Sequence, residues 1–158
     1  MKFLRIILFL GFCATLNGCN QSGSNKSEQV TDIRKTFAEY EALLNSGNYE
    51  ELLHFYADDP RFYWMEDGQV KYSSLDEIAN ALKQLAQYGP GRFEYGEPDI
   101  ILLCSDVASL STTFKTTFGE EGKGGFSFSG ALTATLIKTS SGWQFLFGHS
   151  STQRTQGY

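Results

Sequence analysis

Cysteine and histidine are scarce in this chain of 158 residues, which contains three cysteines and two histidines. We expect Cys13 to be removed with a signal peptide and Cys19 to carry a lipid, so Cys104 has no partner for an intramolecular disulfide in the mature domain. No set of Cys, His and acidic residues has the spacing of zinc ligands or of a calcium-binding loop. We therefore expect a domain without disulfides, metal ions or cofactors, in which Cys104 is a small buried apolar residue.

The sequence shows no apolar run long enough to cross a membrane. Residues 6–14 form an apolar stretch about half as long as the ~20 residues that a membrane-spanning helix requires. Because Lys2 and Arg5 precede it, the stretch is typical of the apolar core of a signal peptide. We expect residues 1–18 to be a signal peptide that is removed from the mature protein.

The residues after this stretch point to lipid attachment. Residues 16–19, Leu-Asn-Gly-Cys, resemble the lipobox of bacterial lipoproteins, in which an apolar residue and two small residues precede an obligatory cysteine. The resemblance implies that Cys19 carries a lipid such as palmitate. Asn17 is larger than usual, and an ordinary secretory signal with a chance cysteine is the alternative. In enteric lipoproteins an Asp directly after the cysteine favours the inner membrane. Because Asn20 stands there, the resemblance implies the periplasmic side of the outer membrane over the inner membrane of the cell envelope.

Charge limits the partners of the mature chain. Without the signal peptide, 11 Lys and Arg stand against 18 Asp and Glu, a net charge of −7. This balance argues against binding nucleic acid or an anionic lipid surface through charge, so we expect membrane contact only through the lipid on Cys19. Residues 19–27 are expected to be the lipidated cysteine and a flexible polar tether. Residues 28–152 then form one domain, and 153–158 a C-terminal tail.

Hydrophobic periodicity predicts helices first and strands afterwards. A helix is expected over residues 28–45, where apolar side chains recur at three- and four-residue steps. A shorter helix over 49–56 follows Asn48 and Glu51, which are spaced as a capping box, and a third covers 75–85. Helices followed by an antiparallel meander are typical of an α+β domain. The expected strands are 61–65, 69–72, 93–103 with an interruption at Pro98, 107–118, 126–139 and 143–151.

This order of elements resembles the cone-shaped fold shared by nuclear transport factor 2 (NTF2), ketosteroid isomerase and the SnoaL-like cyclases. Tyr40, Gly47-Asn48 and the Tyr-Ala-Asp-Asp of residues 56–59 resemble the Tyr, Gly-Asp and Tyr-Ala-Asp-Asp that ketosteroid isomerases have at the same spacing. The final strand, from Gly-Trp-Gln-Phe at 142–145 to His-Ser-Ser at 149–151, is similar to an uncharacterised SnoaL-like branch. The resemblance implies three N-terminal helices packed against a curved, mostly antiparallel sheet, with an apolar pocket at its wide end.

The catalytic groups of ketosteroid isomerase do not carry over to this chain. Its oxyanion tyrosine matches Tyr40 and a supporting tyrosine matches Tyr56, but its general base falls on Trp64. Its protonated aspartate falls near Ala131 and a third tyrosine near Leu82. Because proton abstraction needs a group whose pKa can be tuned towards the working pH, the resemblance implies the fold without that chemistry.

Two functional hypotheses follow. In the favoured one, the domain is a non-enzymatic module that binds a small apolar or aromatic ligand, or a protein partner, and forms a homodimer through its open sheet face. In the other it is a SnoaL-like isomerase, cyclase or dehydratase, with His149 as acid–base group and Tyr40 as hydrogen-bond donor. His149 could instead serve only the structure, and the aromatic residues could only fill the core. The candidate ligand-binding residues are Tyr40, Tyr56, Trp64, Phe114 and His149.

The lipid anchor is tested by replacing Cys19 with Ser, which removes the acylation site. The variant is expected to leave the membrane fraction and appear in the soluble fraction, because no other feature of the sequence predicts membrane attachment. Fractionation and metabolic labelling with a palmitate analogue measure this. Continued sedimentation with membranes would contradict the anchor.

Overall fold

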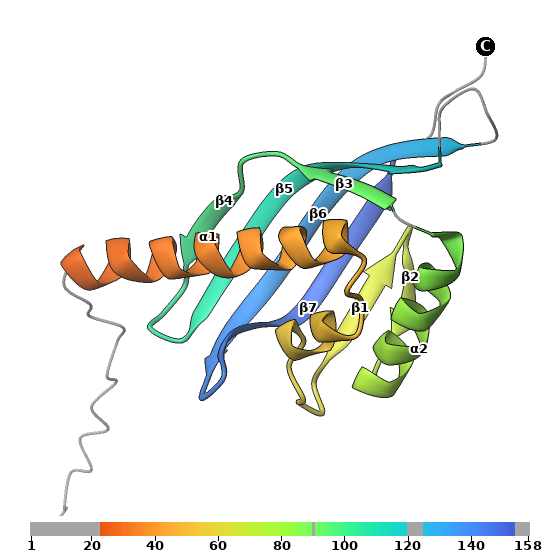
Figure 1. Ribbon diagram of the computed structural model, residues 1–158. Coiled ribbons are helices and arrows are strands. Elements are labelled where there is room, and N and C mark those ends of the chain that lie inside the picture. The colour runs from red at the N-terminus through yellow and green to blue at the C-terminus, as the bar shows by residue number, and fades with distance from the viewer. Residues whose placement is uncertain (1–22, 90, 120–124, 154–158) are drawn as a thin grey trace, which may run out of the picture.

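The computed structural model describes residues 23–89, 91–119 and 125–153. The predicted signal peptide, Cys19 and all but the first residue of the predicted tail lie outside these residues. The described chain folds into two α-helices, two short 3-10 helices and seven strands (Figure 1). In chain order they are α1 (Gly23–Ser46), η1 (Glu51–Phe55), β1 (Tyr63–Glu66), β2 (Gln69–Tyr72), α2 (Leu75–Leu85), η2 (Ala86–Tyr88), β3 (Gly91–Tyr95), β4 (Asp99–Leu102), β5 (Val107–Phe118), β6 (Phe126–Thr139) and β7 (Gly142–Thr152).

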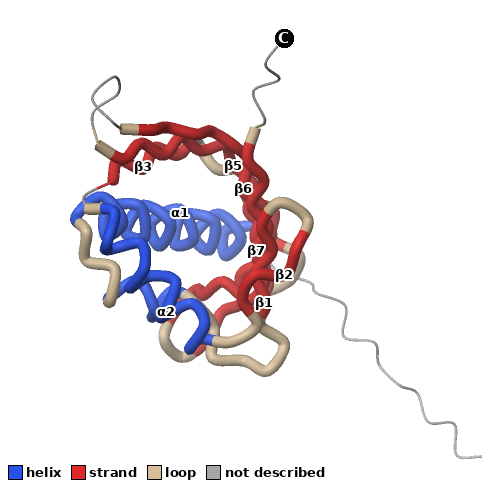
Figure 2. Tube along the Cα trace, turned by 90° about the vertical axis from the view of Figure 1, so that its right-hand side faces the viewer, coloured by secondary structure: helices blue, strands red, loops and turns tan. Residues whose placement is uncertain are grey.

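The strands form one sheet that curves around the helices. Its order is β2-β1-β7-β6-β5-β3, and β4 also pairs with β5. Neighbouring strands are antiparallel except β1 and β7, which run parallel. In Figure 2 the sheet wraps around α1, and α2 lies beside α1 on the same concave side. The structure thus confirms the predicted α+β class and the curved, mostly antiparallel sheet of the NTF2-like cone.

Helix α1 buries the apolar stripe that its sequence predicts. Ile33, Phe37, Tyr40 and Leu44 are nearly fully buried. Their three- and four-residue steps place them on one side of the helix, facing the sheet. Each such side chain contributes about 1.5–3 kcal/mol when it is fully removed from water, so this stripe is a large part of the core.

The first turns of α1 differ from the prediction. The helix begins at Gly23, within the segment 19–27 that was expected to be a flexible tether. Gln29 is buried, and its Nε2 donates a hydrogen bond to the backbone oxygen of Ser105 at 2.9 Å. This contact attaches the start of the helix to the turn before β5, so the end of the predicted tether is helical.

The predicted second helix is wrong in type and length. Only Glu51–Phe55 is helical, and it is a 3-10 helix without a side-chain cap, so two α-helices replace the three expected. Leu52 and Phe55 are its buried residues. Residues three apart lie above one another in a 3-10 helix, so this pair can be buried without a full α-helical turn. The expected capping box of Asn48 and Glu51 does not form.

Helix α2 has the predicted bounds and begins with a side-chain cap. The Ser74 hydroxyl accepts a hydrogen bond from the Glu77 N–H at 3.3 Å, as an N-cap residue does. The Glu77 carboxylate in turn accepts the N–H of Ser73 at 2.6 Å. Ile78 and Leu82 are the buried residues of this helix.

Strand β7 contains a β-bulge that exchanges its two faces. Phe145 pairs with Leu136, but Phe147 pairs with Thr135, so Leu146 between them has no partner on β6. One extra residue moves every later side chain to the opposite face. Before the bulge the odd-numbered residues of β7 point into the concave side, and after it the even-numbered residues do.

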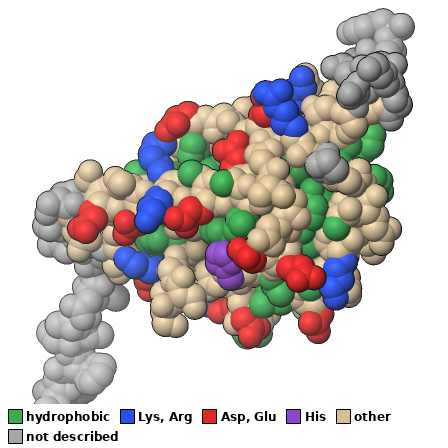
Figure 3. Space-filling model, in the orientation of Figure 1, with side chains coloured by type: hydrophobic (Ala, Val, Ile, Leu, Met, Phe, Trp, Pro, Cys, Tyr) green, Lys and Arg blue, Asp and Glu red, His purple; other side chains and the backbone are tan. Residues whose placement is uncertain are grey.

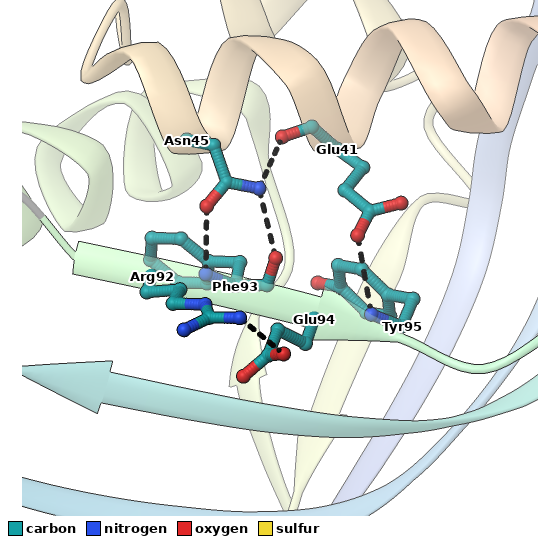
Figure 4. A network of polar contacts seen from close by, with 6 residues as sticks. All are labelled: Glu41, Asn45, Arg92, Phe93, Glu94 and Tyr95. Atoms are coloured by element: carbon teal, nitrogen blue, oxygen red, sulfur yellow. Dashed lines mark hydrogen bonds and ion pairs between the residues drawn. The ribbon is translucent and has the colours of Figure 1, made fainter.

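Side chains of α1 complete the hydrogen bonding of edge strand β3 (Figure 4). Asn45 Oδ1 accepts the N–H of Phe93 at 2.8 Å, and Asn45 Nδ2 donates to the Phe93 carbonyl, also at 2.8 Å. The Glu41 carboxylate accepts the N–H of Tyr95 at 3.2 Å. An unpaired edge would expose these groups. Here they fix the curled edge of the sheet against the helix.

The surface differs between the two sides of the sheet. Ser111, Thr113, Ser127 and Thr133 are exposed on the convex side, and a homodimer through this face stays a prediction. On the helix side, acidic and basic side chains are scattered over α1 and the elements below it (Figure 3). None of the helices in the described part of the chain combines the length and apolar character needed to cross a membrane.

Gly148 provides a test of the packing after the bulge. A Cβ at this position would overlap the Trp64 ring, so Gly148→Ala is expected to lower the free energy of unfolding by about 1–3 kcal/mol, the usual effect of overpacking. Chemical denaturation measures this. Trp64→Leu removes the ring, so in that background the alanine should cost much less. Equal costs in both backgrounds would contradict this packing.

Candidate functional site

A cavity of about 240 Å³ lies between α1, α2 and the concave face of the sheet. It is lined by Tyr40, Tyr56, Trp64 and Phe114, four of the five predicted ligand-binding residues. The structure therefore brings them together, while their contact with a ligand stays a prediction. Eight of the seventeen lining residues are aromatic: Tyr40, Tyr56, Trp64, Tyr72, Phe93, Tyr95, Phe114 and Phe128.

Two buried tyrosines form a hydrogen-bonded pair at this cavity. The hydroxyl oxygens of Tyr40, from α1, and Tyr56, which follows η1, are 2.9 Å apart, and either can be the donor. Burial raises the pKa of both hydroxyls above the usual tyrosine range, most strongly for Tyr40. Both phenols therefore stay protonated at neutral pH. They can donate a hydrogen bond to a ligand, but they cannot act as bases.

Trp64 forms one wall of the cavity. It lies on β1 opposite Gly148 of β7, and the missing side chain there makes room for its ring. The ring lies edge-on to Tyr56 at 5.7 Å and to Phe145 at 5.9 Å between centroids, the arrangement that aromatic pairs prefer. Trp64 is almost fully buried. Its ring narrows the cavity, and a volume of about 240 Å³ remains beside it.

Glu66 is a functional candidate that the sequence reasoning missed. It lies on β1 two residues after Trp64 and also lines the cavity. Burial raises the pKa of its carboxyl, and the positive charge of Lys71 partly opposes this. Side chains two apart share one face of a strand. Once Trp64 was placed in the pocket, this period alone would have placed Glu66 beside it.

His149 does not belong to the cavity, which corrects the prediction that it lines the pocket. It comes after the bulge in β7, pairs with Met65 and Thr133, and is exposed on the convex side. Without the bulge it would share a face with the buried Phe145. The convergence of His149 with Tyr40 on one site, which the enzyme hypothesis required, does not occur.

Of the two other positions transferred from ketosteroid isomerase, one lies outside the cavity and one lines it. Ala131 is exposed on β6, so the predicted position of the protonated aspartate points away from the cavity. The neighbouring Leu132 is buried and lines the cavity instead. Leu82, the predicted position of the third tyrosine, does line the cavity. Apolar side chains, those of Leu82 and Leu132, therefore line the cavity in this region.

Asp59, the second residue of the acidic pair Asp58-Asp59, holds the turn that follows it. Asp59 accepts the backbone N–H of Arg61 at 2.8 Å and forms an ion pair with its guanidinium, also at 2.8 Å. These contacts lower the pKa of Asp59 to about 2. Across the residues that the structure describes, no three Cys, His or acidic side chains lie close enough together to hold a metal ion.

Comparison with known proteins supports the fold. A family model described as a SnoaL-like domain matches residues 33–155, in agreement with the resemblance seen in the sequence. No curated protein matches the chain.

Several solved structures share the architecture. A candidate scytalone dehydratase from Novosphingobium aromaticivorans DSM 12444 is 14% identical, with a TM-score of 0.75 over 87% of this chain and 92% of that one. An NTF2-like superfamily protein from Salmonella enterica serovar Typhimurium LT2 is 14% identical, with a TM-score of 0.70 over 84% and 96%. An NTF2-like protein of unknown function from Shewanella oneidensis MR-1 is 18% identical, with a TM-score of 0.67 over 77% and 98%. At such identities the likeness shows the fold alone.

The tyrosine pair can be tested by a double-mutant cycle. Tyr40→Phe or Tyr56→Phe alone leaves the other buried hydroxyl without its partner, so each is expected to lower the free energy of unfolding by about 1 kcal/mol or more. The double variant should cost little more than either single one. Denaturant unfolding of the four proteins gives the coupling energy, and strictly additive losses would show that the hydroxyls do not interact.

Proposed function

The chain belongs to the SnoaL-like domain family, and we propose that it is a binding module that holds a small, mainly apolar or aromatic molecule without converting it. The observation that carries the proposal is the cavity lining, in which aromatic rings surround a few polar groups. Ligand sites commonly combine such apolar walls with a small number of placed hydrogen-bonding groups. Tyr40 and Tyr56 supply two of those groups.

The size of the cavity limits the ligand. Its volume of about 240 Å³ is below the roughly 300–1,000 Å³ of pockets that hold drug-sized ligands. A molecule with one ring and a short substituent suits this space. Removing such apolar surface from water supplies most of the binding free energy, while the phenol pair fixes the orientation of one polar group.

Catalysis of proton transfer would require a base, and among the described residues that line the cavity Glu66 is the one candidate. A fold neighbour is a candidate scytalone dehydratase, but the expected base His149 lies on the other face of the sheet. Glu66 is the acidic group at the cavity, and conversion of a ligand would have to use its carboxylate. The two phenols would then serve as hydrogen-bond donors to the substrate.

The location of the module rests on the N-terminal sequence. The predicted signal peptide and the resemblance of residues 16–19 to a lipobox support the proposal of a domain held by lipid in the bacterial cell envelope, on the periplasmic side of the outer membrane. A tethered binding domain of this kind would capture its ligand at the membrane surface.

Ligand binding is tested with a broad panel of small aromatic and aliphatic metabolites. At about 100 times its Kd, a cavity ligand stabilises the protein by ~2.7 kcal/mol, which thermal unfolding detects. Tryptophan fluorescence of the Trp143→Phe variant locates the site, because Trp64 is then the single tryptophan. The buried Nε1 of Trp143 has no hydrogen-bond partner among the described residues, so phenylalanine there loses no hydrogen bond. A ligand is expected to change the Trp64 emission.

Two variants of α2 provide the matched control. Ala81 lines the cavity, so Ala81→Phe is expected to fill it and abolish binding. Asn80 is exposed, so Asn80→Phe adds a similar bulk outside the cavity and should leave binding unchanged. Absence of any shift across the panel would contradict the proposal. Mass spectrometry of the bound ligand after incubation should recover it unchanged, and a product would show instead that the cavity is an active site.

A further inference from the structure

The charge of the cavity is the feature that points to a more specific ligand. Among the described residues that line it, Glu66 alone is charged. Lys71, whose positive charge acts on Glu66, is itself exposed and does not line the cavity. The described lining therefore has one negative group and no positive one, and Lys71 acts on Glu66 from outside the lining. An anionic ligand would be repelled, whereas a cation would find a counter-charge.

Aromatic rings line the same cavity as this carboxylate. Tyr40, Tyr56 and Tyr72 are among them. Burial is the main cause of the raised pKa of each of their hydroxyls, and the negative charge of Glu66 adds to it. Trp64 is two residues away on the same face of β1. The rings of Tyr56 and Trp64 meet edge to face at 72°. Different ring faces and edges are thus presented to the same small space.

We infer that the cavity ligand is an organic cation: an amine or quaternary ammonium group on a small apolar or aromatic body, with its charge near Glu66, Trp64 and Tyr56. This deepens the proposed function and rests on it. A cation within about 6 Å of a ring centroid is attracted by the negative face of the ring, most strongly over tryptophan. The partly buried carboxylate of Glu66 gives the ion the counter-charge that a desolvated charge requires.

The phenol pair can donate a hydrogen bond to an acceptor group on such a cation. Tyr40 and Tyr56 share one hydrogen bond, so the second hydroxyl proton can be donated to an acceptor on the ligand. A primary ammonium group has N–H donors of its own to place on Glu66, whereas a quaternary one interacts through the rings and the charge alone. Both kinds of cation fit the inference. The negative charge of Glu66 excludes a carboxylate or phosphate on the part of the ligand that enters the cavity.

The test compares two probes of equal shape. Phenyltrimethylammonium carries a positive charge, and tert-butylbenzene is its neutral carbon counterpart. Calorimetric titration of the full-length protein is done at a pH of about 8, well above the usual carboxyl range, so that Glu66 is ionised. The cation is expected to bind about tenfold tighter than its neutral counterpart or better. Benzoate is expected not to bind.

Variants of two carboxylates separate the cavity charge from the overall charge. Glu66→Gln should reduce the affinity for phenyltrimethylammonium to that for tert-butylbenzene and leave the neutral probe unaffected, which also shows that the variant is folded. Glu94 is on β3, where it pairs with Arg92 and does not line the cavity. Glu94→Gln removes the same charge from the surface, and both affinities should stay as in the wild type.

The outcomes distinguish this inference from the proposed function. Equal binding of both probes, or an unchanged cation affinity in Glu66→Gln, would overturn the cationic ligand while leaving a neutral-ligand module in place. Failure of the cation to bind at all would overturn it as well. The binding function itself fails only if the broad panel gives no ligand that Ala81→Phe excludes.

Discussion

The unpaired Leu146 in β7 is the constraint on which the candidate site depends. A regular strand would keep one set of side chains on the core side along its full length. The extra residue instead turns Gly148 and Ser150 towards the concave side and His149 towards solvent. Because Gly148 has no side chain, the Trp64 ring can lie against the strand there. The bulge thereby determines both the width of the cavity and which chemical groups reach it.

The regular parts of the fold could be predicted from sequence because a local signal persists along them. Alternation over residues 107–118 and 126–139 predicts the full bounds of β5 and β6, and the apolar spacing and cap of residues 75–85 predict α2. The segment 49–56 carries a similar capping signal but becomes a 3-10 helix. Its outcome depends on how Leu52 and Phe55 pack against distant elements, which a short window of sequence does not contain.

The residues of the site could likewise be predicted where a local sequence pattern places them, and could not where their position depends on non-local pairing. Tyr40, Tyr56 and Trp64 could be placed because the spacing of their motif carries over without gaps from a known cone. His149 was misplaced because a bulge adds one residue without a sequence pattern that identifies it. Glu66 belongs to no motif of the family that the sequence resembles, so only the two-residue period of β1, counted from Trp64, places it in the pocket.

The partial burial of Glu66 makes the stability of the folded protein depend on pH. The folded-state pKa of its carboxyl is raised above the usual 4.5, so its favourable contribution to folding is present below that value and is lost as the pH rises through the raised pKa. Where the carboxyl is ionised, the folded chain holds a charge that would be better solvated in the unfolded chain. A cation with an apolar body would offset this cost, since it pairs the charge and contacts the aromatic walls of the cavity.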